Sequence, residues 1–259
     1  MKILLEPCAV QAKRFNLAAG SSLVRPIHLL QSHSAAWAAS DSTDVPVWKP
    51  ALDLICLFLA LPAVLLVTMV IAAIIKTVSP GPAFFKQERV GHRRARFLCW
   101  KFRTMRVGAD TGVHQQHLRE LVQSDAPMTK KDATGDGRLI PCGAMLRATG
   151  LDELPQLLNV WRGEMSLVGP RPCTPCEEEN YRPWQFARFD TLPGLTGHWQ
   201  VSGKNQTTFT EMVTLDILYA HSKSPWLDLK IMAETGSVLI SQARECLGRN
   251  RVPAMYPAH

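Results

Sequence analysis

Residues 51–75 read ALDLICLFLALPAVLLVTMVIAAII, a run that is apolar throughout except for Asp53 and Thr68. As a helix rising about 1.5 Å per residue, a run of 25 residues is long enough to cross a hydrocarbon core of about 30 Å. A buried helix of a soluble core is the alternative, and the length of the run argues against it. The run therefore predicts one membrane-embedded helix, expected over residues 49–77.

Pro62 and the flanking charges bear on how this helix meets the membrane. Pro62 lies near the middle of the run, where a proline removes a helical hydrogen bond and kinks the axis. Between Lys76 and Arg106 the chain has nine Lys or Arg and one acidic residue, Glu88, so this side is expected to face the cytoplasm. Two topologies stay open: a helix that spans the bilayer, which these residues favour, and a helix broken at Pro62 that returns to the same face.

The composition limits the class of protein and the kinds of partner that it can have. The chain has 259 residues, 46% hydrophobic and 20% charged, as in ordinary globular proteins. A formal net charge of +7 favours anionic partners such as nucleic acid, phosphorylated metabolites or acidic lipids. The odd number of cysteines, seven, is typical of reduced thiols. Cys173 and Cys176 have motif spacing, but the second pair of a zinc site and the βαβ setting of a redox motif are missing from the sequence.

The remaining pattern predicts an α+β fold that is mainly helical. Residues 1–48 are expected to form an extension of unknown role, residues 78–240 a cytosolic domain, and residues 241–259 a tail. Within the domain we expect short strands or irregular structure over 83–105, a polar loop over 108–137, two helical pieces around Thr149-Gly150 and a helix over 209–242 that breaks at Ser224-Pro225.

An acidic pair opens the segment LDELPQLLNV at residues 151–160. Pro155 is tolerated in the first turn of a helix, which places Asp152 at or near the N-cap, where the helix N-terminus stabilises a carboxylate. Gly163 is expected to end this helix. The inward face would consist of Leu154, Leu157, Leu158 and Trp161. Taken alone, the pattern is more often that of an ordinary acidic helix start.

Basic residues accompany this segment. In SLVGPRP (166–172), Arg171 stands between two prolines, whose preset backbone suits a guanidinium that binds phosphate with two hydrogen bonds. A rigid surface turn is the alternative for Arg171. Arg147 lies close enough before Asp152 to join the same pocket. Lys101 and Arg103 alternate with aromatic residues, a pattern that fits phosphate-binding residues and, equally, a face that binds lipid headgroups.

Two further motifs complete the pattern, KFRTM (101–105) and PGLTGHWQVSGK (193–204). Together with LDELPQLLNV and SLVGPRP, in this order, they resemble the bacterial sugar transferases. These are monotopic phosphoglycosyl transferases that begin the synthesis of exopolysaccharides and other surface glycans. The resemblance covers residues 49–235. It implies a bacterial inner membrane protein with its catalytic domain on the cytoplasmic face and a re-entrant helix bent at Pro62.

The resemblance also implies a chemistry. Asp152 would attack the β-phosphate of a UDP-sugar, release UMP, hold the phosphosugar covalently and pass it to polyprenyl (undecaprenyl) phosphate. Glu153 would support it as a base or orienting group, and Mg²⁺ would be held partly by Asp152. Phosphate and substrate contacts are expected from Arg147, Arg171, Lys101, Arg103 and Gln156.

Two other functions fit the sequence less well. A membrane-tethered nucleic-acid-binding protein has only the basic and aromatic stretch 84–106 in its favour, without a binding motif, so nucleic acid is not an expected partner. A catalytically inactive membrane scaffold of the same fold is disfavoured by the intact Asp152-Glu153 pair. The expected partners are a UDP-sugar, polyprenyl phosphate and membrane lipids, while the identity of the sugar and homo-oligomerisation stay open.

Overall fold

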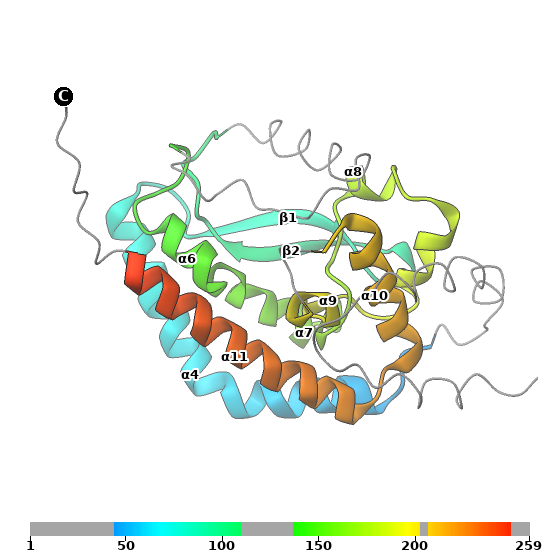
Figure 1. The fold of residues 1–259 in the computed structure, drawn as a ribbon. Helices are drawn as coiled ribbons and strands as arrows, with labels where there is room; N and C mark the ends of the chain where they lie inside the picture. The colour runs from blue at the N-terminus through cyan, green and yellow to red at the C-terminus, as the bar shows by residue number, and fades with distance from the viewer. Residues whose placement is uncertain (1–43, 110–136, 203–206, 250–259) are drawn as a thin grey trace, which may run out of the picture.

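A computed structural model describes residues 44–109, 137–202 and 207–249 (Figure 1). Most of the predicted extension, the polar loop and the end of the predicted tail lie outside these residues. The helices are α4 (Trp48–Val78), α6 (Gly143–Thr149), α7 (Leu157–Trp161), α8 (Pro175–Glu178), α9 (His198–Val201), α10 (Phe209–Ser222) and α11 (Pro225–Arg249), with 3₁₀ helices η1 (His92–Arg94), η3 (Leu151–Gln156) and η4 (Pro183–Phe189). The strands are β1 (Phe84–Val90), β2 (Arg96–Phe102), β3 (Ser166–Val168) and β4 (Gly194–Thr196).

The helix α4 contains the apolar run and extends from Trp48 to Val78. Among the described residues it is the one helix long and apolar enough to cross a membrane. The family resemblance implied a helix broken at Pro62, but the helix is continuous through this residue. Figure 1 shows α4 changing direction partway along its course, as a helix with an interior proline is expected to do. Pro62 therefore lies within an unbroken, bent helix.

Both ends of α4 pack against the same globular body. At its start, the buried Lys49 Nζ donates to the Val168 carbonyl at 2.8 Å and lies 2.7 Å from Asp228 Oδ2. At its end, Ile71 and Ile75 belong to a buried cluster of the globular domain. Between these ends most apolar side chains of the helix are exposed, including Leu54, Ile55, Phe58, Leu59, Leu65, Leu66, Val67, Met69 and Val70.

The strands β1 and β2 form an antiparallel hairpin that pairs Phe84 with Phe102 and Val90 with Arg96. The prediction of short strands here is confirmed. In Figure 1 the hairpin lies on one side of the molecule and α4 and α11 lie on the other, with α6, α7 and α9 between them in this view. The segment LDELPQLLNV forms η3 and most of α7, and Lys101 lies near the end of β2 in the hairpin.

The strands β3 and β4 form a short parallel pair that the sequence did not predict. Gly169 N donates to the Thr196 carbonyl and Gly194 N to the Pro170 carbonyl, each at 2.8 Å. A Cβ on Gly194 would overlap the backbone nitrogen of Gly169. The glycines of SLVGPRP and PGLTG are therefore required because the two backbones touch.

The C-terminal helices follow the prediction. The helix α10 ends at Ser222 and α11 begins at Pro225, so the expected break at Ser224-Pro225 is confirmed. The helix α11 lies alongside α4 (Figure 1). It continues to Arg249, past residue 240, where the sequence predicted that the tail begins.

Candidate active site

The acidic pair lies in a 3₁₀ turn, not at the N-cap of an α-helix. Gly150, with φ of 72°, separates α6 from η3, and Glu153 N donates to the Gly150 carbonyl at 3.1 Å. The tight 3₁₀ turn Leu151–Gln156 accommodates Pro155 and precedes the short helix α7. The predicted division around Thr149-Gly150 is confirmed, and Gly163, with φ of 71°, follows the end of α7 as expected.

The predicted inward face of this segment is wrong in two of its four members. Leu158 is 39% exposed and Trp161 is 62% exposed. Asn159 and Val160 are buried instead. Asn159 Oδ1 accepts from Trp100 N at 3.1 Å, and its Nδ2 donates to the Leu98 carbonyl at 2.8 Å. The amide satisfies the free edge of β2, which outweighs the apolar preference of Leu158 and Trp161 for burial. Asn159 thus attaches the turn to the hairpin.

A pocket opens between the hairpin, η3 and the segments around β3 and β4. Its lining consists of Arg89, Cys99, Lys101, Glu153, Gln156, Arg171, Pro172, Gly194, Leu195 and Gln200. Four of the predicted site residues therefore meet here: Lys101, Glu153, Gln156 and Arg171. Lys101 Nζ lies 3.0 Å from Glu153 Oε1, so the ion pair joins β2 to η3.

The other predicted site residues lie elsewhere. Asp152 is partly buried and directly precedes Glu153 in η3, but it is not among the lining residues of the pocket. Arg147 is partly buried in α6 and does not line the pocket either. Arg103 differs from the prediction, because its buried guanidinium donates to the Ser79, Pro80 and Pro82 carbonyls at the turn after α4. The structure gives Arg103 this supporting position instead of a place in the pocket.

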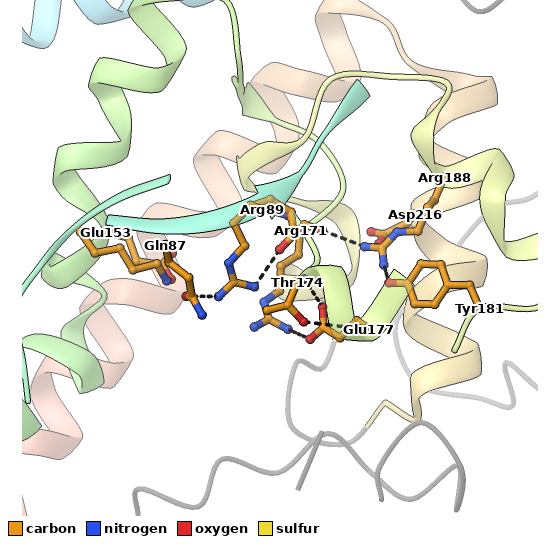
Figure 2. A network of polar contacts seen from close by, with 11 residues as sticks. Gln87, Arg89, Glu153, Arg171, Thr174, Glu177, Tyr181, Arg188 and Asp216 are labelled. Carbon is orange, nitrogen blue, oxygen red and sulfur yellow. Dashed lines mark hydrogen bonds and ion pairs between the residues drawn. The ribbon is translucent and has the colours of Figure 1, made fainter. Parts of the chain in front are cut away.

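Arg171 is held mainly through its backbone (Figure 2). Its carbonyl accepts from Arg188 Nη2 at 2.9 Å, and the buried Arg188 is bonded to Asp216 and Tyr181. Burial lowers the pKa of Arg188, but Tyr181 and Asp216 outweigh it, so the pKa lies above its usual range. The guanidinium of Arg171 itself makes a looser contact, 3.7 Å from Glu177 Oε1. This arrangement leaves the Arg171 side chain available to a ligand.

Arg89 and Gln200 line the pocket and were not predicted from the sequence. Arg89 is 4% exposed and lies on β1, where its partner across the hairpin is Phe97. Cys99 and Lys101 follow at alternate positions of β2 and share this face of the hairpin. Successive side chains of a strand point to opposite faces, so the register of β1 with β2 is enough to place Arg89 on the same face as Cys99 and Lys101.

The buried thiols of the described residues are poorly suited to nucleophilic or redox chemistry. Cys56, Cys99, Cys142, Cys173 and Cys176 are free thiols. Burial raises the pKa of Cys173 to about 11, and burial also raises the pKa of Cys99 in the pocket. Both thiols are therefore neutral near pH 7 and poor nucleophiles.

The carboxylates of Asp152 and Glu153 fit a Mg²⁺ ion only if a substrate supplies further ligands. In residues 44–109, 137–202 and 207–249, no group of three or more His, Cys, Asp or Glu side chains could hold a metal. Asp152 and Glu153 provide two adjacent carboxylates. Mg²⁺ is commonly held by one or two carboxylates, with substrate phosphates and waters completing its shell, so the pair fits such an ion.

Comparison with known proteins places the sequence in a family. The sequence model of the family described as "Bacterial sugar transferase" matches residues 45–242. The exopolysaccharide production protein ExoY of Sinorhizobium fredii is 35% identical over 187 residues, which cover 72% of this chain and 83% of that protein. The UDP-glucose:undecaprenyl-phosphate glucose-1-phosphate transferase of Caulobacter vibrioides is 41% identical over 207 residues, which cover 76% and 71%.

A third relative is longer. The galactosyl transferase CpsE of Streptococcus agalactiae is 42% identical over 161 residues, which cover 62% of this chain but 35% of that protein. The chain therefore spans about a third of the length of this relative. The resemblance that the motifs indicated is confirmed over most of the sequence, and the chain belongs to the bacterial sugar transferase family.

Proposed function

We propose that this protein transfers a sugar-1-phosphate from a UDP-sugar to polyprenyl (undecaprenyl) phosphate and releases UMP, as the first step of exopolysaccharide or other surface-glycan synthesis. The observation that carries this proposal is the adjacent pair Asp152-Glu153 on one 3₁₀ turn, beside a pocket lined by Arg89, Lys101 and Arg171. A carboxylate is a suitable acceptor for a phosphoryl group, and three cations suit a diphosphate. The names of relatives that act on undecaprenyl phosphate support the same reaction.

The proposed reaction has two displacements at one phosphorus atom. A carboxylate oxygen of Asp152 attacks the β-phosphorus of the UDP-sugar, and the bond from that phosphorus to the bridging oxygen breaks, so that UMP leaves with the electron pair. A phosphate oxygen of the polyprenyl phosphate then attacks the same phosphorus. The acyl phosphate bond breaks, which regenerates the Asp152 carboxylate and yields a polyprenyl diphosphate sugar.

The neighbouring residues have supporting roles in this proposal. Lys101, 3.0 Å from Glu153, orients the Glu153 carboxylate and adds positive charge where the diphosphate would lie. Arg171 would bind a phosphate with its two-pronged guanidinium. Bound by Asp152 and the diphosphate, Mg²⁺ would neutralise the charge that develops on the leaving UMP. Gln156 is a candidate for a neutral hydrogen bond to the substrate.

We further propose that α4 dips into the cytoplasmic leaflet and does not span the bilayer. The support is that both ends of α4 contact one body, through Lys49 at the start and Ile75 at the end, while its middle is exposed and apolar. A spanning helix would place these two ends on opposite sides of the membrane. The basic stretch that follows α4 favours the cytoplasmic side. The pocket would then lie near the lipid surface, where a polyprenyl acceptor can reach it.

A UMP-release assay tests the transferase directly. The purified full chain in detergent is given Mg²⁺, polyprenyl phosphate and a panel of UDP-sugars, and UMP is quantified. At least one UDP-sugar should yield UMP in a reaction that requires the protein, the acceptor for sustained turnover, and Mg²⁺. A catalytically inactive scaffold would release no UMP with any sugar in the panel. That result would contradict the transferase proposal and favour the scaffold.

A further inference from the structure

Arg89 is a buried cation without a carboxylate partner in the described part of the chain. Its Nη1 donates to the Pro172 carbonyl at 3.1 Å, and its Nη2 donates to Gln87 Oε1 at 2.7 Å. Its Nε is buried and makes no hydrogen bond within the residues described. Figure 2 shows the guanidinium lying between Gln87 and the chain at Arg171.

The other cations of the pocket have acidic partners. Lys101 pairs with Glu153 at 3.0 Å, and Arg171 lies 3.7 Å from Glu177. Arg89 has only neutral oxygens, although it is 4% exposed and cannot draw on bulk water. Burial lowers the pKa of Arg89, the positive charge of Arg171 lowers it further, and the carboxylates of Glu177 and Glu153 offset this only in part. A guanidinium nevertheless remains protonated.

A buried charge that makes no ion pair is costly, and a ligand of opposite charge offsets this cost. The lining of this pocket contains three cations and one anion, Glu153, which leaves an excess of positive charge. The unused Nε–H and the planar guanidinium suit a phosphate oxygen, which accepts charge-assisted hydrogen bonds from arginine.

We infer that Arg89 is a phosphate-binding residue of this pocket, where it and Arg171 hold one phosphate group of a substrate. The inference rests on the proposed function, in which both the nucleotide and the lipid acceptor carry such a group. Arg89 also bonds to the Pro172 carbonyl next to Arg171, so phosphate binding would fix the position of both arginines at once.

Binding measurements on the full chain separate this role from a structural one. Affinities of the native protein, Arg89→Lys and Arg89→Met are measured by calorimetry for two pairs of probes: UMP with uridine, and farnesyl phosphate with farnesol. Arg93→Met is the matched control, because Arg93 is an exposed arginine in the turn of the same hairpin. Thermal unfolding of each ligand-free variant accompanies the titrations.

Arg89→Met should weaken binding of a phosphate-bearing probe roughly tenfold to a hundredfold, the typical effect of a lost hydrogen bond to a charged group. Arg89→Lys should be weakened as well, because lysine lacks the planar fork. The phosphate-free member of the pair and the Arg93→Met control should change little. A loss confined to UMP assigns the phosphate to the nucleotide, and a loss confined to farnesyl phosphate assigns it to the lipid acceptor.

Three results would overturn the inference: unchanged affinity for both phosphate probes, equal losses for the phosphate-free probes, or no binding of either phosphate probe by the native protein. The transferase proposal has a separate outcome. If the native protein releases UMP while its phosphate affinity is independent of Arg89, only the inference fails. If Arg89 governs phosphate affinity but no UDP-sugar yields UMP, only the transferase proposal fails.

Discussion

Arg171 owes its position to backbone contacts and not to its own ion pair. Arg188 holds the Arg171 carbonyl at 2.9 Å, and Pro170 and Pro172 restrict the chain on either side. The side chain is therefore prearranged but weakly paired, as a ligand-binding arginine should be. Its two-pronged geometry, and not its charge alone, is what the site would use.

Replacing Arg171 with lysine tests this point. Arg171→Lys keeps the charge but loses the fork, so kcat/KM for UMP release should fall on the order of tenfold or more while the unfolding midpoint stays near that of the native protein. Arg182→Lys is the matched control, since Arg182 is exposed and its side chain is not among the lining residues of the pocket. If Arg171→Lys has the kinetics of the native protein, Arg171 is an ordinary residue of a surface turn and does not bind phosphate.

The sequence predicted the pocket better than its surroundings. Lys101, Glu153 and Arg171 could be predicted because each belongs to a motif whose residue types indicate phosphate chemistry, and the three do line one pocket. Arg103 alternates with Lys101 along the chain, so the sequence predicts the same role for both. Its guanidinium instead binds the Pro80 and Pro82 carbonyls, a contact that the residues around Arg103 do not indicate. Arg89 was missed because the burial of a strand residue depends on strand register, which the local sequence does not contain.

At the scale of elements, helices were predicted more reliably than the parallel strand pair. The bounds of α4 and the break before α11 follow from apolar length and from proline, which are local properties. The strands β3 and β4 have three residues each and pair across distant segments, so they have no periodicity to detect. The sequence feature that marks these strands is their glycines, and a glycine indicates a close approach of two backbones only when the neighbouring strand is known.

Gly194→Ala tests the closeness of these strands. Its methyl group would overlap the Gly169 backbone, so the strands must separate, and the free energy of unfolding should fall by about 1–3 kcal/mol or more. Because Pro170 and Arg171 directly follow Gly169, UMP release should fall as well.

Gly236→Ala is the control in chemical denaturation, because its methyl group meets no other atom within 4 Å. The alanine there should leave stability unchanged or raise it slightly, as alanine favours helix. If Gly194→Ala unfolds at the same denaturant concentration as the native protein, the close contact between β3 and β4 is wrong.

At the scale of the whole molecule, the ends of α4 decide the topology. Val47 before the helix is 86% exposed and Val107 after it is 69% exposed. In a chain whose native cysteines are replaced, Val47→Cys and Val107→Cys should both react with a membrane-impermeant thiol reagent from the cytoplasmic side only. A dipping helix places both on that side, whereas a spanning helix separates them. Labelling of Val47→Cys from the outer side of intact cells would contradict the proposed topology.

The covalent intermediate on Asp152 is the central claim, and trapping it is the most direct test. The protein is mixed with Mg²⁺ and a UDP-sugar that supports UMP release, without acceptor, then quenched and examined by intact-protein and peptide mass spectrometry. One sugar phosphate per chain should appear on the peptide that contains Asp152, with one equivalent of UMP, and polyprenyl phosphate should discharge it. Asp152→Asn should form no adduct while it remains folded. If UMP forms with acceptor present but no adduct is found, or if Asp152→Asn retains a tenth of the activity, the covalent mechanism is wrong.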